Sequence, residues 1–300
     1  MKLYQWVMPI LGLLLIPMSA SAKTEETSSL SEIVGKASGM QTKITEDGVV
    51  RLGWPRQDVA VTVDGMSLAP PAGLGSWAAF KPAHEGVMLM GDTVVFEDEI
   101  TPAMDAALAH GLEVTALHNH FVFDDPPVYF MHIGGMGDSA KLAEGVKATW
   151  DAIKAVRKEH PQPQRRFSGG VPELTGKFNV EQLQDLLKST PELNGKVVKF
   201  TFGREGKMHG VPVGASMGLS TWAAFSGNDQ FAAVAGDFIM TADEVQPVIK
   251  SLRENGIHIV ALHNHMMGET PAFYFLHYWG KGPAANLAKG IKKALDTQKQ

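Results

Sequence analysis

The stretch Ala116-Leu117-His118-Asn119-His120 occurs a second time as Ala261-Leu262-His263-Asn264-His265, 145 positions further along the chain. The match continues without a gap, and nine of the twenty residues from His118 to Gly137 are identical to those of the second copy. Such a match at one fixed spacing indicates an internal duplication. Each copy carries a His-x-His pair and a third histidine twelve residues after the second; these are His118, His120 and His132, and His263, His265 and His277.

The repeated motif is predicted to lie on β-strands over residues 112–121 and 257–266. Successive side chains on a strand point to opposite faces. Val114, Ala116, His118 and His120 are therefore expected on one face. Two imidazoles separated by two positions lie about 6.5–7 Å apart along a strand, close enough to bind one ion. A turn rich in Asp and Pro then reverses the chain. A second strand, over 128–133 or 273–278, brings the third histidine back beside the pair.

The residues around each hairpin predict the same order of elements in both copies. A helix comes first, at 30–36 or 180–188, and strands follow at 49–53, 58–63 and 196–202. The Trp-Ala-Ala-Phe segments are expected to enter core strands, because tryptophan buries a large area. Short strands are then predicted to end at a Gly-Asp pair before an internal helix; they cover 87–90 and 231–235.

The internal helix of the second copy has a capping box, Thr241-x-x-Glu244, and ends at Asn255-Gly256. In the first copy Asp98-Glu99 is expected to cap the same helix. A Gly-rich turn and an amphipathic helix close each copy. The sequence therefore predicts an α+β fold of two tandem homologous repeats. Each repeat has a mainly antiparallel sheet, an internal helix, a His-bearing β-hairpin and a C-terminal helix.

The first 22 residues are typical of a cleavable export signal. Lys2 precedes an apolar run over 7–16, and Ala20-Ser21-Ala22 fits the small-x-small cleavage rule. The run is too short to span about 30 Å of hydrocarbon, so no stable membrane insertion is expected after cleavage. We predict a signal peptide (1–22), repeat 1 (23–160, with a flexible polar lead over 23–29), a linker (161–172) and repeat 2 (173–300). The mature protein is expected in the periplasm or secreted.

The composition excludes several classes of protein. The chain has no cysteine, which rules out disulfides, thiolate metal sites, a cysteine nucleophile and a lipid-modified N-terminal cysteine. The net charge is −5, and removing Lys2 with the signal gives −5 − 1 = −6, so nothing resembles the basic surface of a nucleic-acid-binding protein. A hydrophobic content of 44% can fill two cores. The oligomeric state is not predicted.

The three histidines of each copy suggest a metal site. Three neutral imidazoles with an open position suit Zn²⁺, and also Cu²⁺, Ni²⁺ or Fe²⁺. Asp124 or Asp125, and Glu269 at the place that matches Asp124, are candidates to complete the ligand set or to act as the general base towards a bound water. The alternative is structural, with imidazole N–H groups pinning the hairpin to its neighbours.

Weaker signals surround the histidines. The Gly-rich segments after the third histidine resemble an anion pocket at a helix N-terminus, although a tight turn is the commoner use of such a sequence. Aromatic residues crowd both hairpins and are expected to be mainly core. The candidate ligand-binding residues are Tyr129, Tyr274, Gly135 and Gly280.

Taken together, these motifs resemble the LppY/LpqO family. The resemblance is carried by Leu-Gly-(Ser/Thr)-Trp-Ala-Ala-Phe, by Gly-Asp before a helix, and by Ala-Leu-His-Asn-His followed by Tyr-Phe-x-His, in both repeats. It implies export and duplication, but no catalytic residue, because that family is a domain of unknown function. Some of its members are lipoproteins, and this chain lacks the cysteine they require.

Three functions follow as hypotheses. The first is an exported protein that binds a metal or small ligand at the His-x-His…His site of each repeat. The second is a metal-dependent hydrolase that uses a metal-bound water, and the third is a structural or interaction module. The sequence does not tell whether the hairpins form one shared site or two.

Overall fold

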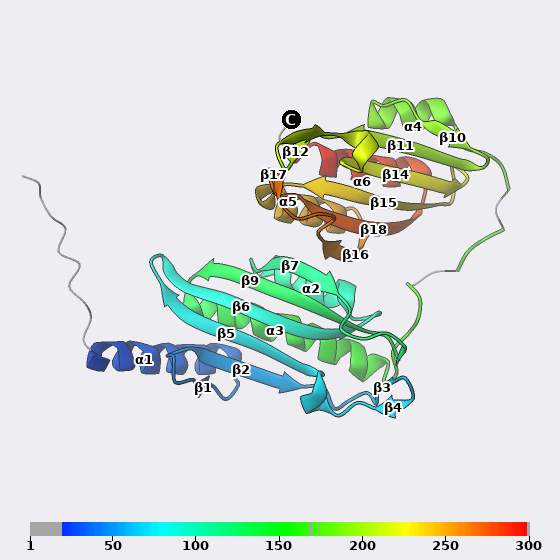
Figure 1. Ribbon diagram of the computed structural model, residues 1–300. Helices are drawn as coiled ribbons and strands as arrows, with labels where there is room; N and C mark the ends of the chain where they lie inside the picture. The colour runs from blue at the N-terminus through cyan, green and yellow to red at the C-terminus, as the bar shows by residue number, and fades with distance from the viewer. Residues whose placement is uncertain (1–19, 168–169, 174, 299–300) are drawn as a thin grey trace, which may run out of the picture.

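One twelve-stranded antiparallel sheet runs through both repeats of the computed structural model, which describes residues 20–167, 170–173 and 175–298 (Figure 1). Repeat 1 contributes, in spatial order, β1 (Lys43–Ile44), β2 (Val50–Pro55), β5 (Gly75–Ala83), β6 (Gly86–Phe96), β9 (Val128–Gly137) and β7 (Glu113–His118). Repeat 2 continues with β16 (His258–His263), β18 (Tyr274–Gly282), β15 (Ala232–Met240), β14 (Ser220–Gly227), β11 (Val197–Gly203) and β10 (Glu192–Asn194).

The second set of strands repeats the first in reverse order, so the repeats are related by a pseudo-two-fold axis. The axis passes between β7 and β16, which are antiparallel neighbours joined where Leu117 pairs with Leu262. Both leucines are buried, and they belong to one hydrophobic core that extends through both repeats. The His-bearing strands of the two repeats therefore lie side by side at the centre of the sheet.

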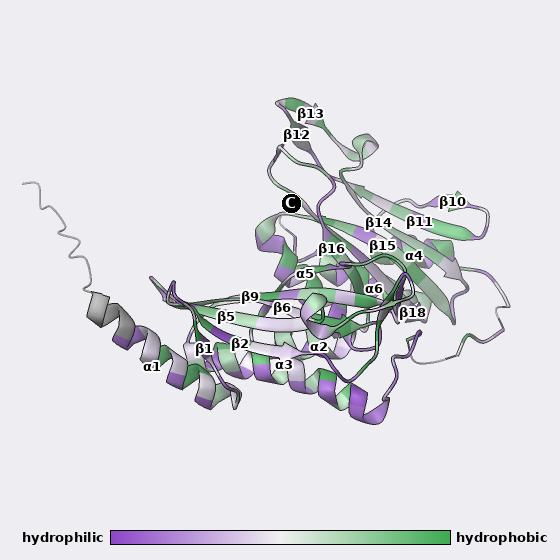
Figure 2. Ribbon diagram, turned by 60° about the horizontal axis from the view of Figure 1, so that its bottom comes forward, coloured by the Kyte–Doolittle hydropathy of each residue, from purple (hydrophilic) through white to green (hydrophobic). Residues whose placement is uncertain are grey.

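The six helices of the described ranges all contribute to that core, which places them on one face of the sheet. They are α1 (Ala20–Ser38), α2 (Ile100–Ala109), α3 (Ser139–Glu159), α4 (Val180–Leu187), α5 (Ala242–Glu254) and α6 (Ala284–Leu295). Figure 2 shows hydrophilic and hydrophobic residues interspersed along α1 and α3, as expected for helices with one buried side. The opposite face of the sheet is called the open face below. Within the described ranges, no helix is long and apolar enough to cross a membrane.

Two small sheets extend from the hairpins. In repeat 1, β3 (Thr62–Val63) pairs with β4 (Met66–Ser67) and β8 (Asp124–Asp125); in repeat 2, β12 (Gly206–Met208) pairs with β13 (Val211–Val213) and β17 (Glu269–Thr270). Short 3₁₀ helices, η1 (Pro70–Ala72) and η2 (Ala215–Met217), lead into β5 and β14. These sheets tie the turn of each His hairpin to an earlier part of the same repeat.

The α+β fold with two mainly antiparallel repeats is confirmed, as are both His hairpins. The capping box at Thr241 and Glu244 is also present. Other expectations were wrong. The polar segment 23–29 is part of α1, only Thr62 and Val63 of 58–63 form a strand, and the Gly-rich segments continue β9 and β18 instead of turning. Residues 1–19 of the predicted signal lie outside the described ranges.

A β-bulge in each His-bearing strand changes which residues share a face. The register with the neighbouring strand shifts between Val114 and Ala116 in β7, and between Ile259 and Ala261 in β16. Val114 is consequently buried with Leu117 on the helix side. The expectation that Val114 shares a face with the first histidine pair is therefore wrong, because simple alternation cannot anticipate a bulge.

Candidate metal centres

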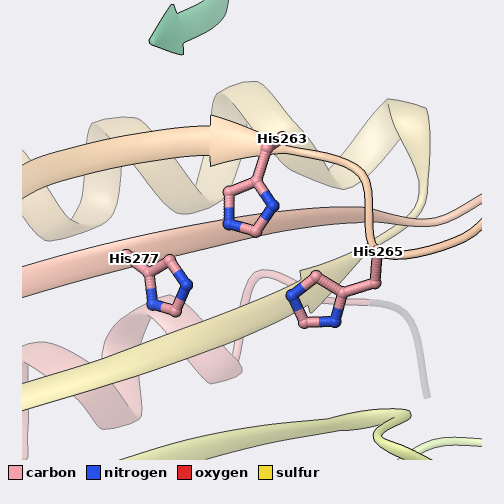
Figure 3. Close-up of side chains that lie close together, drawn as sticks. All are labelled: His263, His265 and His277. Carbon is pink, nitrogen blue, oxygen red and sulfur yellow. The ribbon is translucent and has the colours of Figure 1, made fainter. Parts of the chain in front are cut away.

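Three imidazoles of repeat 2 converge on the open face of the sheet. His263 ends β16, His265 lies in the following loop, and His277 is on β18 (Figure 3). One ligand nitrogen from each ring can be chosen so that all three lie within 4.8 Å of one another. The spacing suits convergence on one metal ion, because Zn–N bonds are about 2.0–2.1 Å long. The hairpin predicted from the sequence therefore brings the third histidine beside the pair.

Neighbouring groups fix the orientation of these rings. The Nδ1 atom of His263 lies 3.3 Å from the Asn264 carbonyl oxygen, and that of His277 lies 3.2 Å from the Gly236 carbonyl oxygen. A carbonyl can only accept, so each Nδ1 carries a proton, and in a neutral ring Nε2 is then the nitrogen that has the lone pair. His265 is held differently: its ring stacks on Phe275, with centroids 3.4 Å apart and planes 10° from parallel. A hydrogen bond from the second ring nitrogen to a backbone carbonyl is a usual way in which proteins orient ligating histidines.

A buried carboxylate completes the cluster. Asp237 is on β15 directly opposite His277 in the strand register, and one carboxylate oxygen lies 3.4 Å from Nε2 of His265. Its side chain is only 3% exposed, and its Oδ1 atom has no hydrogen-bond partner among the described residues. Burial raises the pKa of Asp237, while the imidazoles of His277 and His263 act in the opposite direction. A buried carboxylate oxygen without a partner is costly, and a cation bound between it and the imidazoles would remove that cost.

The electrostatics of the imidazoles also favour a cation. Burial, followed by the neighbouring His263 and His277, lowers the pKa of His265. Its ring is therefore neutral at neutral pH, with a lone pair available to a metal without competition from a proton. The ring is still about one-third exposed, at 32%, which leaves a route for an ion or a small ligand to enter.

Repeat 1 contains the same residues with almost the same spacing of the rings as the 5.1 and 5.0 Å between the matching centroids of repeat 2. The ring of His118 lies 5.2 Å from that of His120 and 5.0 Å from that of His132, measured between centroids. Nε2 of His132 is 3.8 Å from Asp92, whose Oδ1 atom also lacks a partner within the described part of the chain. His120 stacks on Phe130 at 3.3 Å. In the residues described, three histidine ligand atoms lie within 4.8 Å of one another only in repeat 2.

The same charge balance is present in repeat 1. Burial raises the pKa of Asp92, against the effect of the three imidazoles, and burial lowers the pKa of His120. The Nδ1 atom of His118 lies 3.2 Å from the Asn119 carbonyl oxygen, as in repeat 2. Repeat 1 therefore has the same ligand types and a similar bias towards a bound cation, with less convergence of its donor atoms.

Sequence reasoning missed the two aspartates. Asp92 and Asp237 were read as residues at the ends of short strands, but β6 and β15 continue to Phe96 and Met240. The available signal was the repetition of Gly-Asp at the same 145-residue spacing as the histidines.

The predicted bases have other partners. Asp124 accepts a hydrogen bond from the backbone N–H of Val128 at 2.6 Å, and Glu269 accepts one from that of Phe273 at 3.0 Å. Both carboxylates thereby brace the turn of the hairpin. Asp125 is exposed and forms an ion pair with Arg165. A catalytic role for these residues stays a prediction.

The weaker ligand-binding candidates lie elsewhere. Tyr129 and Tyr274 are half-buried and pack against the core on the helix side. A Cβ atom at Gly135 would lie 2.8 Å from Leu142, and one at Gly280 would lie 2.9 Å from Leu287. These glycines thus allow the C-terminal helix of each repeat to approach the sheet closely.

The two clusters are neighbours on one face. Leu117 and Leu262 pair across the junction and point into the core, so the residues that follow them, His118 and His263, point to the open face. Residues placed diagonally in this way are about 7–8 Å apart in a regular antiparallel ladder. Each cluster is nevertheless built from residues of its own repeat.

Comparison with known proteins places the chain in a family without assigned chemistry. The chain belongs to the family described as Domain of Unknown Function (DUF1259), which matches residues 31–152 and again 181–297. The two matches correspond to the two repeats. The narrower resemblance to LppY/LpqO proteins stays a prediction.

No curated protein matches the chain. Among solved structures, a match is found to a trimeric bacterial microcompartment shell protein, PduB. The identity is 10%, the alignment covers 85% of this chain and 89% of that chain, and the TM-score is 0.22. A likeness at this level carries no argument about fold or function.

Proposed function

We propose that each repeat binds one divalent transition-metal ion through three imidazoles and one carboxylate. The observation that carries the proposal is the convergence of His263, His265 and His277 beside the buried, unpartnered Oδ1 atom of Asp237. In repeat 1 the ligands are His118, His120, His132 and Asp92. Imidazole and carboxylate together suit Zn²⁺, with Fe²⁺, Ni²⁺ and Cu²⁺ as alternatives of the same class.

A purely structural role for the histidines fits less well. Histidines that pin a hairpin use their N–H groups, and the Nδ1 atoms of His263 and His277 do bond to backbone carbonyls. The remaining ring nitrogens, however, gather near one another and near a carboxylate, which a set of independent pins does not require. This gathering supports metal ligation.

The partial exposure of the imidazoles supports a second candidate, hydrolysis by a metal-bound water. His132 is 36% exposed and His265 is 32% exposed at the side chain, so a coordination position facing solvent can hold water. Such a water is acidified by the metal and becomes a nucleophile near neutral pH. In that mechanism Asp124 and Glu269 are the candidate bases, each through the carboxylate oxygen that does not accept the hairpin N–H.

Export accompanies this proposal. The first 22 residues have the positive end, apolar run and small-residue cleavage site of a secretory signal. We infer that the mature chain begins at Lys23, in the periplasm or outside the cell. N-terminal sequencing of the protein recovered from the native host tests this, and an intact Met1 would refute it.

Metal content and calorimetry test the main proposal. Purified metal-free protein is titrated with Zn²⁺ and compared with two triple variants, H118A/H120A/H132A and H263A/H265A/H277A. We expect two equivalents in the wild type, one in each variant, and tighter binding at repeat 2. His84→Ala, at an exposed histidine outside both clusters, is the control and should keep both equivalents. Unchanged stoichiometry in the triple variants, or no binding of any divalent transition ion by folded wild type, would overturn the proposal.

A further inference from the structure

Three methionines stand exposed together on the open face of repeat 1. Met88 and Met90 are on β6 and Met136 is on β9, with exposed fractions of 37%, 59% and 55%. Residues two apart on a strand share a face, and Asp92 is the next residue on the same face of β6. The methionines therefore lie on the same surface as the histidine cluster, beyond its carboxylate.

The strand register brings their side chains within reach of one another. Met88 is directly opposite Met136, which places their Cβ atoms about 4.5–5.5 Å apart. Met90 is about 6.5–7 Å from Met88 along the strand and faces Gly134, which has no side chain to intervene. Methionine has three rotatable side-chain bonds, so the three sulfur atoms can converge on one point above the sheet.

The fold itself does not require these methionines. In repeat 2, Ala233 and Ala235 occupy the places of Met88 and Met90, and Lys281 occupies the place of Met136. The same pairs of strands form there with no thioether. Comparison of the two repeats thus shows that the strand pairing does not depend on the three methionines, which occur at these positions only in repeat 1.

We propose that Met88, Met90 and Met136 form a binding site for a soft monovalent metal ion, Cu(I). Thioether sulfur selects Cu(I) over the hard and borderline divalent ions, since it is a neutral, polarisable donor. The chain has no cysteine, so methionine is its only soft ligand. The site is separate from the imidazole clusters and is present in repeat 1 alone.

The inference is independent of the divalent ion proposed for the histidines. Its ligands share no side chain with that site, and the ion is supplied already reduced, so no electron transfer is involved. The competing explanation for grouped methionines is an adaptable apolar surface that docks another molecule. That explanation predicts no ordered response of the three sulfur atoms to a soft ion.

Two measurements on the full purified protein test the site. In the first, Cu(I) is titrated anaerobically in competition with a chromogenic chelator. In the second, ¹³C-methyl-methionine NMR follows the addition of Ag(I), a redox-stable substitute. We expect one equivalent of Cu(I) to bind, and three methyl resonances to shift together up to one equivalent of Ag(I). The triple variant M88L/M90L/M136L keeps the apolar volume and should weaken binding at least tenfold.

Two further variants make the result decisive. M66L/M217L changes exposed methionines outside the cluster and should bind Cu(I) as the wild type does. H118A/H120A/H132A should also keep Cu(I) binding, even though it loses its divalent ion. Cu(I) binding that survives in the triple leucine variant, that disappears with the histidines, or that is absent from the wild type would each overturn the inference.

Discussion

Changing Asp237 to Asn should move stability and metal affinity in opposite directions. In the metal-free protein the Asp237 carboxylate is almost fully buried, and one of its oxygens has no partner in the described part of the chain. An unsatisfied buried group of this kind costs about 1–3 kcal/mol, and more when it is charged. Asn has nearly the same shape and no charge, so we expect the metal-free variant to be more stable at neutral pH by about 1 kcal/mol. For a chain of this size that corresponds to a rise in Tm of about 2–4 °C.

The pH dependence has a definite sign. Because the folded-state pKa of Asp237 is raised above its unfolded value, the folded protein binds the proton more readily than the unfolded chain does. The destabilisation is therefore fully present above the folded-state pKa and is relieved as the pH falls through the folded and then the unfolded value. The advantage of the Asn variant over wild type should shrink over the same interval.

Metal binding should respond in the other direction. Loss of the carboxylate should weaken Zn²⁺ binding at repeat 2 about 10–100-fold, as changes beside or within a ligand set commonly do. A ligand at one hundred times its Kd stabilises the folded protein by about 2.7 kcal/mol. At the same Zn²⁺ concentration, the gain would be about 1.4 kcal/mol for a tenfold weaker site and about 0.4 kcal/mol for a hundredfold weaker one.

Thermal melts with and without Zn²⁺, together with calorimetry, measure both effects. Wild type, Asp237→Asn and the exposed control Asp185→Asn are compared after removal of metal. The control should match the wild type in both respects. An Asp237→Asn variant that is less stable without metal and binds Zn²⁺ as tightly as the wild type would refute the reasoning.

Three further substitutions test buried or half-buried residues of the two repeats. Gly236→Ala should destabilise the protein by about 1–3 kcal/mol in urea unfolding and weaken Zn²⁺ binding at repeat 2, because the added Cβ would overlap the Tyr278 hydroxyl. Arg56→Met removes the bidentate partner of the buried Glu99 carboxylate and leaves it Arg157 as its ion-pair partner, so urea unfolding should show a loss of about 1–3 kcal/mol. Burial lowers the pKa of His258 to about 4, so wild-type stability should fall as the pH drops from about 6.5 towards 4, and His258→Gln should flatten that fall in thermal melts.

Each of these predictions has a direct control. Gly53→Ala adds a methyl group where nothing lies within 4 Å, and it should change neither stability nor Zn²⁺ binding comparably. A double variant that replaces Arg56 and Glu99 with apolar residues should recover part of the loss. His84→Gln should leave the pH profile unchanged. Wild-type behaviour of any of the three test variants would contradict its prediction.

The duplicated hairpin could be predicted from sequence because its information is local. Alternating side chains, a Pro-containing turn and a fixed spacing between two copies place His132 beside His118 without knowledge of the rest of the fold. The capping box at Thr241 is local in the same way, since its two hydrogen bonds involve residues three positions apart. Neither inference needed a partner from a distant part of the chain.

Asp92 and Asp237 could not be placed by local reasoning. Gly and Asp are both unfavourable in strands, so a Gly-Asp pair indicates the end of a strand when taken alone. In the folded protein β6 is paired along its length with β9, and β15 with β18, and this pairing outweighs the local preference. Glycine is also needed at position 236 because the Tyr278 side chain crosses there to bond the Trp222 carbonyl oxygen.

The β-bulges in β7 and β16 could not be predicted from the alternation of side chains either. One extra residue in β7 and in β16 leaves Val114 and Leu117 on the core side, three positions apart, while Ala116 and His118 face the opposite way. The histidines reach the open face because of this irregularity. The junction leucines can consequently seal the core between the repeats while the next residue in each strand presents an imidazole to solvent.

The pseudo-two-fold arrangement explains how the repeats can diverge without loss of the fold. The main core and the helices lie on one side of the sheet, and the histidines, aspartates and methionines lie on the other, where two smaller cores form around Phe130 and Phe275. Substitutions at the exposed positions of the open face, such as Met88, Met90 and Met136, therefore change ligand chemistry at little cost in packing. Repeat 2 has its imidazole cluster on the same face as Lys281, whereas repeat 1 has its cluster on the same face as three thioethers. A single sheet thus presents two different ligand sets next to each other, and its main core, on the opposite face, is shared by both repeats.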